Sequence, residues 1–453
     1  MEVSFTPLKP AEVDADLLVL PESAARALGL GEALDRVRFD GGELLLPRRD
    51  GDPFTAQALL VIADESDEHE VRRAAGRVAP RLAGFGTVAV ALPYPEAVVE
   101  GVRLGGYRFD GYKSAPDTRA VRRLIVFGDG DARRAGIVAD AVNLTRDLVN
   151  TPAGDLVPMD LAARAREIAG ATGLEVTVLD DEALRAGGFG GIAGVGAASA
   201  NPPCLIEVTY RGEGRKRVGL AGKGITFDSG GLDIKGQKAM AEMKCDMAGG
   251  ATMLAVVQAA ARLELPVGVT AVVPAAENMV SGHATRPGDV LRHRNGRTTE
   301  VIDTDCEGRL VLADALAYLA ESAPDVLIDA ATLTYSVMHA LGEDITGVLG
   351  SDRALTAELI EAGERTGEPM WELPLWRPYA KRLESQIADS RNDGGAHADA
   401  TIAALFLEPF TAGLPWAHLD FATTAYLDGA TDLGPAGATG AMVRTLVSYL
   451  ERC

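Results

Sequence analysis

The sequence predicts an α/β protein with a smaller N-terminal domain and a larger C-terminal domain that holds a mixed, mostly parallel sheet. Three observations carry this prediction. Short β-rich runs alternate with longer helical stretches, which is the pattern of βαβ units. In the later part of the chain the β-rich runs are almost continuously apolar, as expected for strands buried on both faces. The length of 453 residues fits two or three domains of about 150 residues each.

The first domain is predicted from β-rich runs that flank charged helical stretches. Its strands are expected at 58–63, 87–92 and 124–127, with a helix at 68–83 between the first two. An amphipathic helix follows over 132–148, and the Pro and Gly of 150–154 (NTPAG) end it. We therefore predict an N-terminal α/β domain over 1–131, a linker helix over 132–150 and the second domain over 151–453.

The second domain is predicted from the same alternation, now with longer apolar strands. Helices are expected at 159–169, 248–263 and 311–321, and strands at 174–179, 205–210, 217–221, 267–274 and 326–330. In sheets of this kind, functional residues gather in the loops beyond the carboxyl ends of the strands. The chemically suggestive motifs of this chain fall in such loops.

Composition and charge exclude several classes of protein. Apolar residues make up 47% and charged residues 24%, as in globular rather than disordered or fibrous chains. The chain has 44 Lys and Arg against 65 Asp and Glu, which gives a net charge of −21. Such a surface repels phosphate backbones, so nucleic-acid binding is not expected. The N-terminal stretch lacks the apolar core of a signal peptide, and no apolar run reaches the roughly 18 residues of a membrane span. We therefore expect a cytoplasmic protein.

Several common catalytic motifs are absent. The segment 219–224 has glycines too close together for a phosphate-binding loop, and the chain has no G-x-S-x-G or H-E-x-x-H motif. The six histidines are scattered and read as surface or core residues.

Two segments dense in carboxylates predict a metal site. The first runs over 222–235 and continues to 243–247, and the second is 303–310 (DTDCEGRL). Asp305 and Glu307 occupy alternate positions, so both can point to one side of an extended strand end. Asp228 and Asp246 can reach the same place, and four oxygen donors suit one or two divalent ions. Taken alone, 303–309 also fits a turn with a helix cap. A two-metal phosphoesterase remains an alternative to a peptidase.

These segments resemble the leucyl (cytosol) aminopeptidases, dinuclear zinc or manganese peptidases that form hexamers. The resemblance rests on GKGITFDSGG at 222–231 and DTDCEGRL at 303–310. It is supported by RDLVNTP at 146–152, GHATRPGDVL at 282–291, DAATLT at 329–334 and GATGAMVRTL at 437–446. It runs from about residue 140 to the end. The N-terminal domain of the family resembles macro-type, ADP-ribose-binding folds.

The resemblance implies roles for particular residues. One ion would be bound by Lys223, Asp228, Asp246 and Glu307, and the more readily exchanged ion by Asp228, Asp305 and Glu307. Lys235 and Arg309 would be the catalytic cations, and Met243, Thr332, Leu333 and Tyr335 would line the substrate pocket. Lys223 can serve as a ligand only as a neutral amine, which requires its pKa of about 10.4 to fall by more than three units.

The resemblance also implies a mechanism. Two divalent ions, Zn²⁺ and/or Mn²⁺, would activate a water that attacks the scissile carbonyl, with Lys235 polarising that carbonyl. A bicarbonate ion held by Arg309 would carry the proton, because the planar guanidinium matches a planar anion. The free α-amine of a peptide or aminoacyl substrate would bind a metal, so only N-terminal residues would be removed.

Tyr335 is the largest departure from the family pattern, which usually has Gly there. A tyrosine should narrow the pocket, so we expect a weakened preference for plain leucine. The alternative is a peptidase dedicated to one pathway with a narrow substrate.

Overall fold

The computed structural model describes residues 1–37, 40 and 42–453 and divides into two compact units. The first comprises Met1–Asp140 and Gly429–Ala436, and the second comprises Ala141–Asp428 and Gly437–Cys453. The division falls inside helix α5 (Ala132–Asn150), which the sequence predicts as a linker. Sequence reasoning did not anticipate that residues 429–436 return to the first unit.

The first unit is built on a six-stranded sheet in the described residues, with the order β1-β6-β5-β2-β4-β3. All neighbouring strands are parallel except β3 and β4. The strands are β1 (Glu2–Thr6), β2 (Leu17–Pro21), β3 (Leu44–Pro47), β4 (Ala58–Ile62), β5 (Thr87–Val90) and β6 (Arg123–Phe127). The helices before α5 are α1 (Glu22–Ala25), α2 (Gly31–Arg36), α3 (Glu68–Leu82) and α4 (Pro95–Gly105). The sequence anticipated β4, β5, β6 and α3, but not β1 to β3.

The second unit is built on a sheet of nine strands in the described chain, ordered β16-β15-β18-β14-β9-β11-β8-β7 with β10 paired to β11. The central pairs β18/β14, β14/β9, β9/β11 and β10/β11 are parallel, whereas β7, β8 and β15 bring in antiparallel pairs. These strands are β7 (Glu175–Leu179), β8 (Cys204–Tyr210), β9 (Arg217–Gly222), β10 (Gly224–Asp228), β11 (Gly268–Asn278), β14 (Val326–Ala331), β15 (Thr346–Gly350), β16 (Met370–Glu372) and β18 (Trp416–Asp420). The predicted mixed, mostly parallel sheet is confirmed.

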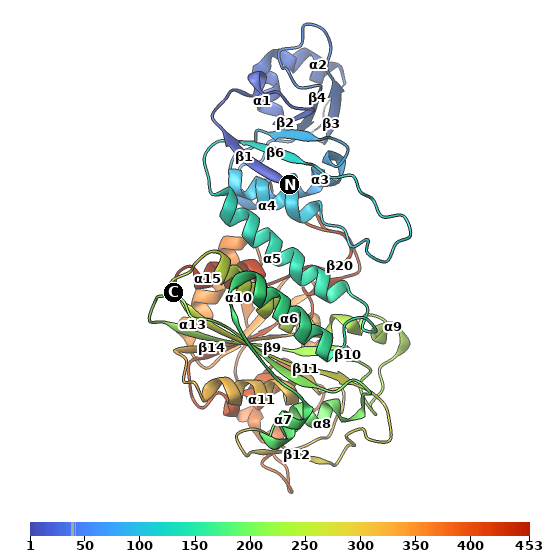
Figure 1. Cartoon of the computed structure of the whole chain (residues 1–453), viewed down its shortest axis with the longest axis vertical. Helices are drawn as coiled ribbons and strands as arrows, with labels where there is room; N and C mark the ends of the chain where they lie inside the picture. The colour runs from blue at the N-terminus through green and yellow to red at the C-terminus, as the bar shows by residue number, and fades with distance from the viewer. Residues whose placement is uncertain (38–39, 41) are drawn as a thin grey trace. The chain divides into compact units, whose positions relative to one another are not determined.

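Helices cover both faces of this sheet (Figure 1). Helices α6 (Pro158–Thr172) and α10 (Ala248–Arg262) lie on one face, and α11 (Gly308–Ala320) lies on the other. The remaining helices of the unit are α7 (Asp181–Ala186), α8 (Gly190–Val195), α9 (Gln237–Met240), α12 (Tyr335–Leu341), α13 (Arg353–Thr366), α14 (Asp399–Leu407) and α15 (Val443–Leu450). Among the helices described, none is long and apolar enough to cross a bilayer.

The buried histidines of the second unit are held inside the core by carboxylates. His418 Nδ1 lies 2.6 Å from Asp329 Oδ1, and Trp416 Nε1 donates to Asp329 Oδ2 at 2.7 Å. His293 Nδ1 lies 3.1 Å from Asp314 Oδ1. These contacts pair both oxygens of Asp329 and one ring nitrogen of each histidine, which lowers the cost of burying these polar groups. Both histidines thus have core positions, as the sequence suggested.

Candidate active site

The site lies where the central parallel strands end. Lys223 follows β9, Asp228 ends β10, Asn278 ends β11 and Thr332 follows β14. Because these strands run parallel, their carboxyl ends meet at one edge of the sheet. A cavity of about 420 Å³ opens there, and Lys223, Asp228 and Thr332 line it.

Lys223 is buried among acceptors from three parts of the chain. Its Nζ lies 2.8 Å from Asp246 Oδ1, 2.8 Å from Glu307 Oε1 and 3.1 Å from the carbonyl oxygen of Thr332. The three N–H groups of an ammonium match these three acceptors. A Cβ on Gly308 would lie 2.4 Å from Lys223 Cε, so only glycine at 308 leaves room for this side chain.

Lys235 joins the other two carboxylates of the site. Its Nζ lies 2.8 Å from Asp228 Oδ2 and 2.6 Å from Asp305 Oδ1. The loop that returns Lys235 to the site turns at Gly230 (φ 85°) and Gly231 (φ 63°), in the left-handed region that favours glycine. The predicted metal-binding residues and Lys235 are thus brought together, although their roles stay predictions.

The backbone around Asp305 differs from the extended strand end that the sequence suggested. Asp303 Oδ1 accepts a hydrogen bond from Asp305 N at 2.7 Å, and Glu307 is the N-cap of α11 with φ −76° and ψ −33°. A short carboxylate side chain that bonds the backbone two residues on makes a turn rather than a strand. The prediction of a strand end is wrong here. The turn and helix cap instead bring both carboxylates into the site.

Asn278 orients Asp228 and was missed by sequence reasoning. Its Nδ2 donates to Asp228 Oδ1 at 2.8 Å and to the carbonyl oxygen of Thr304 at 2.9 Å. The expected strand 267–274 stopped four residues short of Asn278, the last residue of β11. The available signal was a polar residue at the carboxyl end of a strand.

The carboxylates fit a cation. Ligand oxygens of Asp228, Asp305 and Glu307 all lie within 4.8 Å of one another. Among the described residues, Asp246 Oδ2 and Glu307 Oε2 are buried and have no hydrogen-bond partner. Buried, unpaired carboxylate oxygens are costly unless a cation binds them. Hard oxygen donors with one amine suit divalent ions such as Zn²⁺ or Mn²⁺.

The charges of the site lead to the same conclusion. Burial raises the pKa of Asp246 and Glu307, and repulsion from neighbouring carboxylates adds to the effect. Burial and repulsion from Asp228 raise the pKa of Asp305 to about 7. Burial lowers the pKa of Lys223 and Lys235, but the surrounding carboxylates outweigh it and raise the pKa of both. The carboxylates hold more negative charge than two ammonium groups can offset.

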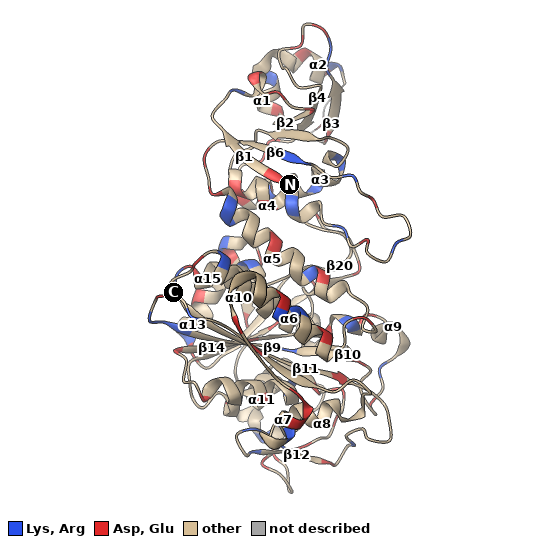
Figure 2. Ribbon diagram, viewed as in Figure 1, with Lys and Arg blue, Asp and Glu red and all other residues tan. Residues whose placement is uncertain are grey.

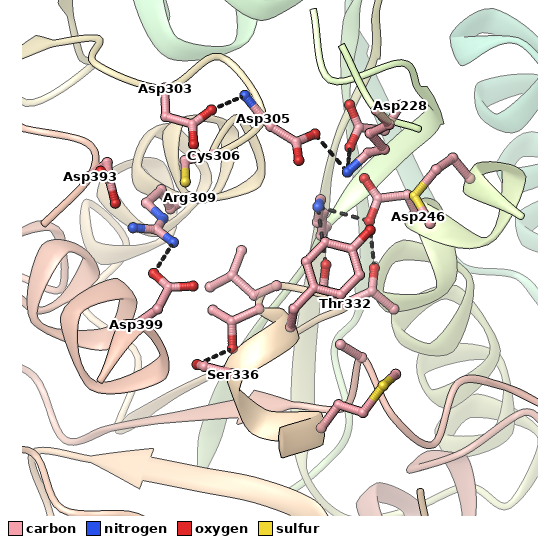
Figure 3. A pocket seen from close by; sticks show the side chains of 18 of the residues that line it. Asp228, Asp246, Asp303, Asp305, Cys306, Arg309, Thr332, Ser336, Asp393 and Asp399 are labelled. Carbon is pink, nitrogen blue, oxygen red and sulfur yellow. Dashed lines mark hydrogen bonds and ion pairs between the residues drawn. The ribbon is translucent and has the colours of Figure 1, made fainter. Parts of the chain in front are cut away.

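Arg309 lies in the same cavity, 1% exposed, and both of its terminal nitrogens are paired with protein groups, whereas its buried Nε has no hydrogen-bond partner among the described residues. Its Nη1 donates to the carbonyl oxygen of Asn392 at 2.7 Å. Its Nη2 donates to Asp399 Oδ1 at 2.8 Å, a contact that Figure 3 shows. The bicarbonate expected at Arg309 thus meets a guanidinium that has a carboxylate partner, and it fits poorly. Asp399 was missed by sequence reasoning, because it is the first residue of α14, a helix that the hydrophobic pattern did not predict.

The predicted substrate-pocket residues Met243, Thr332 and Leu333 line the cavity. Thr332 Oγ1 donates to Asp246 Oδ1 at 2.7 Å, so the loop after β14 is tied to the carboxylate cluster. Leu333 N donates to the buried Asp420 Oδ1 at 3.3 Å. These two contacts fix the loop at the edge of the cavity.

Tyr335 also lines the cavity, with half of its surface exposed. Lys235 Nζ lies 5.5 Å from the centroid of the Tyr335 ring, within the range of a cation–π contact. Met338 and His339, one turn further along α12, line the cavity too and were not predicted. The tyrosine therefore takes up space beside Lys235.

An open cavity with buried carboxylates and lysines at the carboxyl edge of a parallel sheet is typical of metal-dependent α/β hydrolases. The model of the cytosol aminopeptidase family, catalytic domain, matches residues 143–447, and that of the family's N-terminal domain matches residues 62–116. The chain belongs to the cytosol aminopeptidase family.

Relatives and solved structures agree with this assignment. A probable cytosol aminopeptidase of Streptomyces coelicolor is 44% identical over 417 residues, which cover 85% of this chain and 81% of that protein. The structure of bottromycin maturation enzyme BotP in complex with Mn is 37% identical, with a TM-score of 0.89 over 97% of this chain and 99% of that chain. Cytosol aminopeptidase from Coxiella burnetii is 30% identical, with a TM-score of 0.89 over 99% of each chain. The chain is therefore a metallo-exopeptidase of the leucyl aminopeptidase type.

Proposed function

We propose that the chain removes single residues from free peptide N-termini with two divalent ions held by Lys223, Asp228, Asp246, Asp305 and Glu307. The observation that carries this proposal is the cluster of carboxylate oxygens within 4.8 Å of one another. Bound ions would supply Lewis acidity and an activated water. The ions are proposed to be Zn²⁺, Mn²⁺ or both, and the metal add-back assay described below distinguishes these cases.

Lys235 has the geometry to hold the carbonyl of the scissile bond. Two of its three N–H groups point to Asp228 and Asp305, which leaves one for a substrate oxygen in the cavity. The raised pKa of Lys235 keeps the ammonium charged at neutral pH. A fixed cation beside the carbonyl oxygen stabilises the negative charge that grows there during attack.

Tyr335 is proposed to set specificity by narrowing the cavity. Lys235 Nζ lies over its ring, and Met338 lines the same cavity. A substrate side chain therefore shares this space with a phenol ring at a position where the family usually has glycine. We propose that preference for plain leucine is weakened as a result. A peptidase dedicated to one pathway is the second candidate, supported by the 37% identity to a structure described as a maturation enzyme.

A substrate panel tests these proposals. Purified protein is stripped with a chelator, given back zinc, manganese or cobalt, and assayed on aminoacyl amides and dipeptides, with N-acetylated substrates as the control. Metal-dependent release of the first residue that acetylation abolishes is the expected result. If leucine and methionine are the best first residues, the proposal for Tyr335 is refuted. If the metal-loaded protein leaves the whole panel uncut, a narrow substrate replaces the general aminopeptidase.

Assembly and location are proposed as a homohexamer in the cytoplasm. The second unit exposes four large apolar side chains, those of Trp371, Trp376, Tyr379 and Ile387. Burial against another subunit would remove them from water, which supports a subunit contact at this surface. Light scattering after size exclusion measures the assembly, and a mass of one or two chains refutes the hexamer.

Lys and Arg are interspersed with Asp and Glu along the described chain (Figure 2), which supports a peptide rather than a nucleic acid as substrate.

A further inference from the structure

We infer that Asp399 supplies, from the chain itself, the proton-accepting carboxylate that the family resemblance assigns to a bound bicarbonate ion at Arg309. The inference rests on the aminopeptidase function proposed above. It makes Asp399 a further catalytic residue and predicts that this enzyme works without bicarbonate.

The first observation is that Arg309 is fixed against protein acceptors. Nη2 donates to Asp399 Oδ1 at 2.8 Å and Nη1 to the carbonyl oxygen of Asn392 at 2.7 Å. Asn392 is itself fully buried, and its side chain accepts from Ile302 N at 2.7 Å and donates to the carbonyl oxygen of Asp303 at 2.6 Å. The guanidinium therefore cannot turn away from Asp399 without breaking this network.

The second observation is the charge around Arg309. Asp303, Asp393 and Asp399 line the same cavity, and Figure 3 shows all three on the side of the cavity where Arg309 lies. One guanidinium thus faces three carboxyl groups. A free bicarbonate would bring a further negative charge into this part of the cavity, which like-charge repulsion opposes.

The third observation is that the fold holds Asp399 in place. Asp399 opens α14, and the preceding Ala398 has φ 56°, a left-handed conformation that costs free energy for a residue with a Cβ. Ser336 Oγ accepts a hydrogen bond from Ala400 N at 2.8 Å and so anchors the start of the helix. Strained backbone of this kind is retained where the surrounding structure needs it, and here it directs a carboxylate to the cavity.

Asp399 lines the same cavity as the metal-binding carboxylates, from its opposite side. Figure 3 shows Asp399 and Arg309 on one side of the cavity, with Asp228 and Asp246 across it. One Asp399 oxygen bonds Arg309, and the other remains to accept a proton, directly or across one water. Water loses this proton as its oxygen bonds the carbonyl carbon. The same proton passes to the amine nitrogen as the C–N bond breaks, so the carboxylate is regenerated and one water is consumed per bond cut.

Activity in carbonate-free buffer tests the inference. The activity of the zinc-loaded wild type should change by less than about twofold when bicarbonate is added. Without bicarbonate, the activity of Asp399→Ala should be lower than that of the wild type by about 10²–10⁴-fold, the usual contribution of a general base. Bicarbonate or formate at millimolar concentration should then restore at least part of the activity of Asp399→Ala, because Arg309 has lost its carboxylate. Asp393→Asn removes a charge from the same cavity and should acquire no bicarbonate dependence.

Binding of ¹³C-bicarbonate, followed by NMR on the zinc-loaded protein, needs no turnover. We expect binding to Asp399→Ala, and none to the wild type or to Asp399→Ala with Arg309→Met. Stimulation of the wild type by bicarbonate, bicarbonate binding to it, or full activity of Asp399→Ala without added anion overturns the inference. Asp399→Asn keeps the side-chain size if the alanine variant unfolds. Inactivity of the wild type on every peptide would refute the proposed function instead, and the binding experiment would still decide this inference.

Discussion

Replacement of Lys235 by Met should cost much more stability in the metal-free protein than in the metal-loaded one. The Lys235 side chain is 7% exposed and lies 2.8 Å from Asp228 and 2.6 Å from Asp305. Methionine keeps most of the length of the side chain but removes the charge. Without Lys235, two neighbouring carboxylates lose the cation that separates them.

The magnitude follows from the burial of these groups. Removing one partner of a buried ion pair costs about 3–5 kcal/mol, because the other charge stays buried and unpaired. We therefore expect the free energy of unfolding of the metal-free protein to fall by about 3–5 kcal/mol. Bound divalent ions would compensate the same carboxylates, so the cost should shrink to about 1–2 kcal/mol, near that of one hydrogen bond. The loss of kcat should be about 10²–10³, as for other donors to a developing oxyanion.

Urea unfolding of wild type and Lys235→Met, each with and without zinc, measures this difference. Lys238→Met is the matched control, since Lys238 is exposed three residues away and should change neither stability nor kcat. If Lys235→Met lowers the free energy of unfolding equally with and without zinc, the idea that the ions and Lys235 neutralise the same carboxylates is refuted. An unchanged kcat would refute the role of Lys235 in the reaction.

Three further predictions concern the same cavity. Tyr335→Gly should raise kcat/KM for leucyl amides by about tenfold, since it removes the ring beside Lys235, and an unchanged ranking of substrates would contradict this. Asp305, whose pKa is raised to about 7, is protonated below that pH in the metal-free protein. The Kd of the more readily exchanged ion, measured by chelator competition, should therefore rise about tenfold for each pH unit below 7, and Asp305→Asn should weaken the binding of this ion but flatten the slope. Asn278→Ala should weaken metal binding about 10–100-fold, because Asp228 loses a donor that orients it; equal affinity would show that Asp228 needs no such support.

Hydrophobic patterning predicted three of the strands that carry the site, β9, β11 and β14, but neither β10, which ends in Asp228, nor the full sheets. After Arg217, β9 has only apolar residues and glycine, and β14 is apolar except for Asp329, so pattern alone located both strands. The pairs of β8 with β7 and with β11 are antiparallel, and residues 429–436 return to the first unit. Strand direction and such returns depend on contacts between segments far apart in the chain, which periodicity does not encode.

The same distinction applies within the site. Lys223, Asp228 and Glu307 lie in local motifs, so resemblance and residue chemistry found them together. Asn278 and Asp399 act on Asp228 and Arg309 across 50 and 90 positions of sequence, respectively. Each is an ordinary polar residue at the end of a strand or the start of a helix. Only the folded chain shows which functional group they touch.

The contacts of the two lysines give a physical reason for two proposed ion sites of unequal strength. All three N–H groups of Lys223 are matched, its side chain is 5% exposed, and its lone pair becomes available only after it loses a proton. An ion beside Lys223 must displace buried contacts and that proton, so it should enter and leave slowly. At the other position Asp305 is 24% exposed, and Lys235 need not give up its proton. An ion held there by Asp228, Asp305 and Glu307 meets a smaller barrier, which makes it the ion that should exchange first.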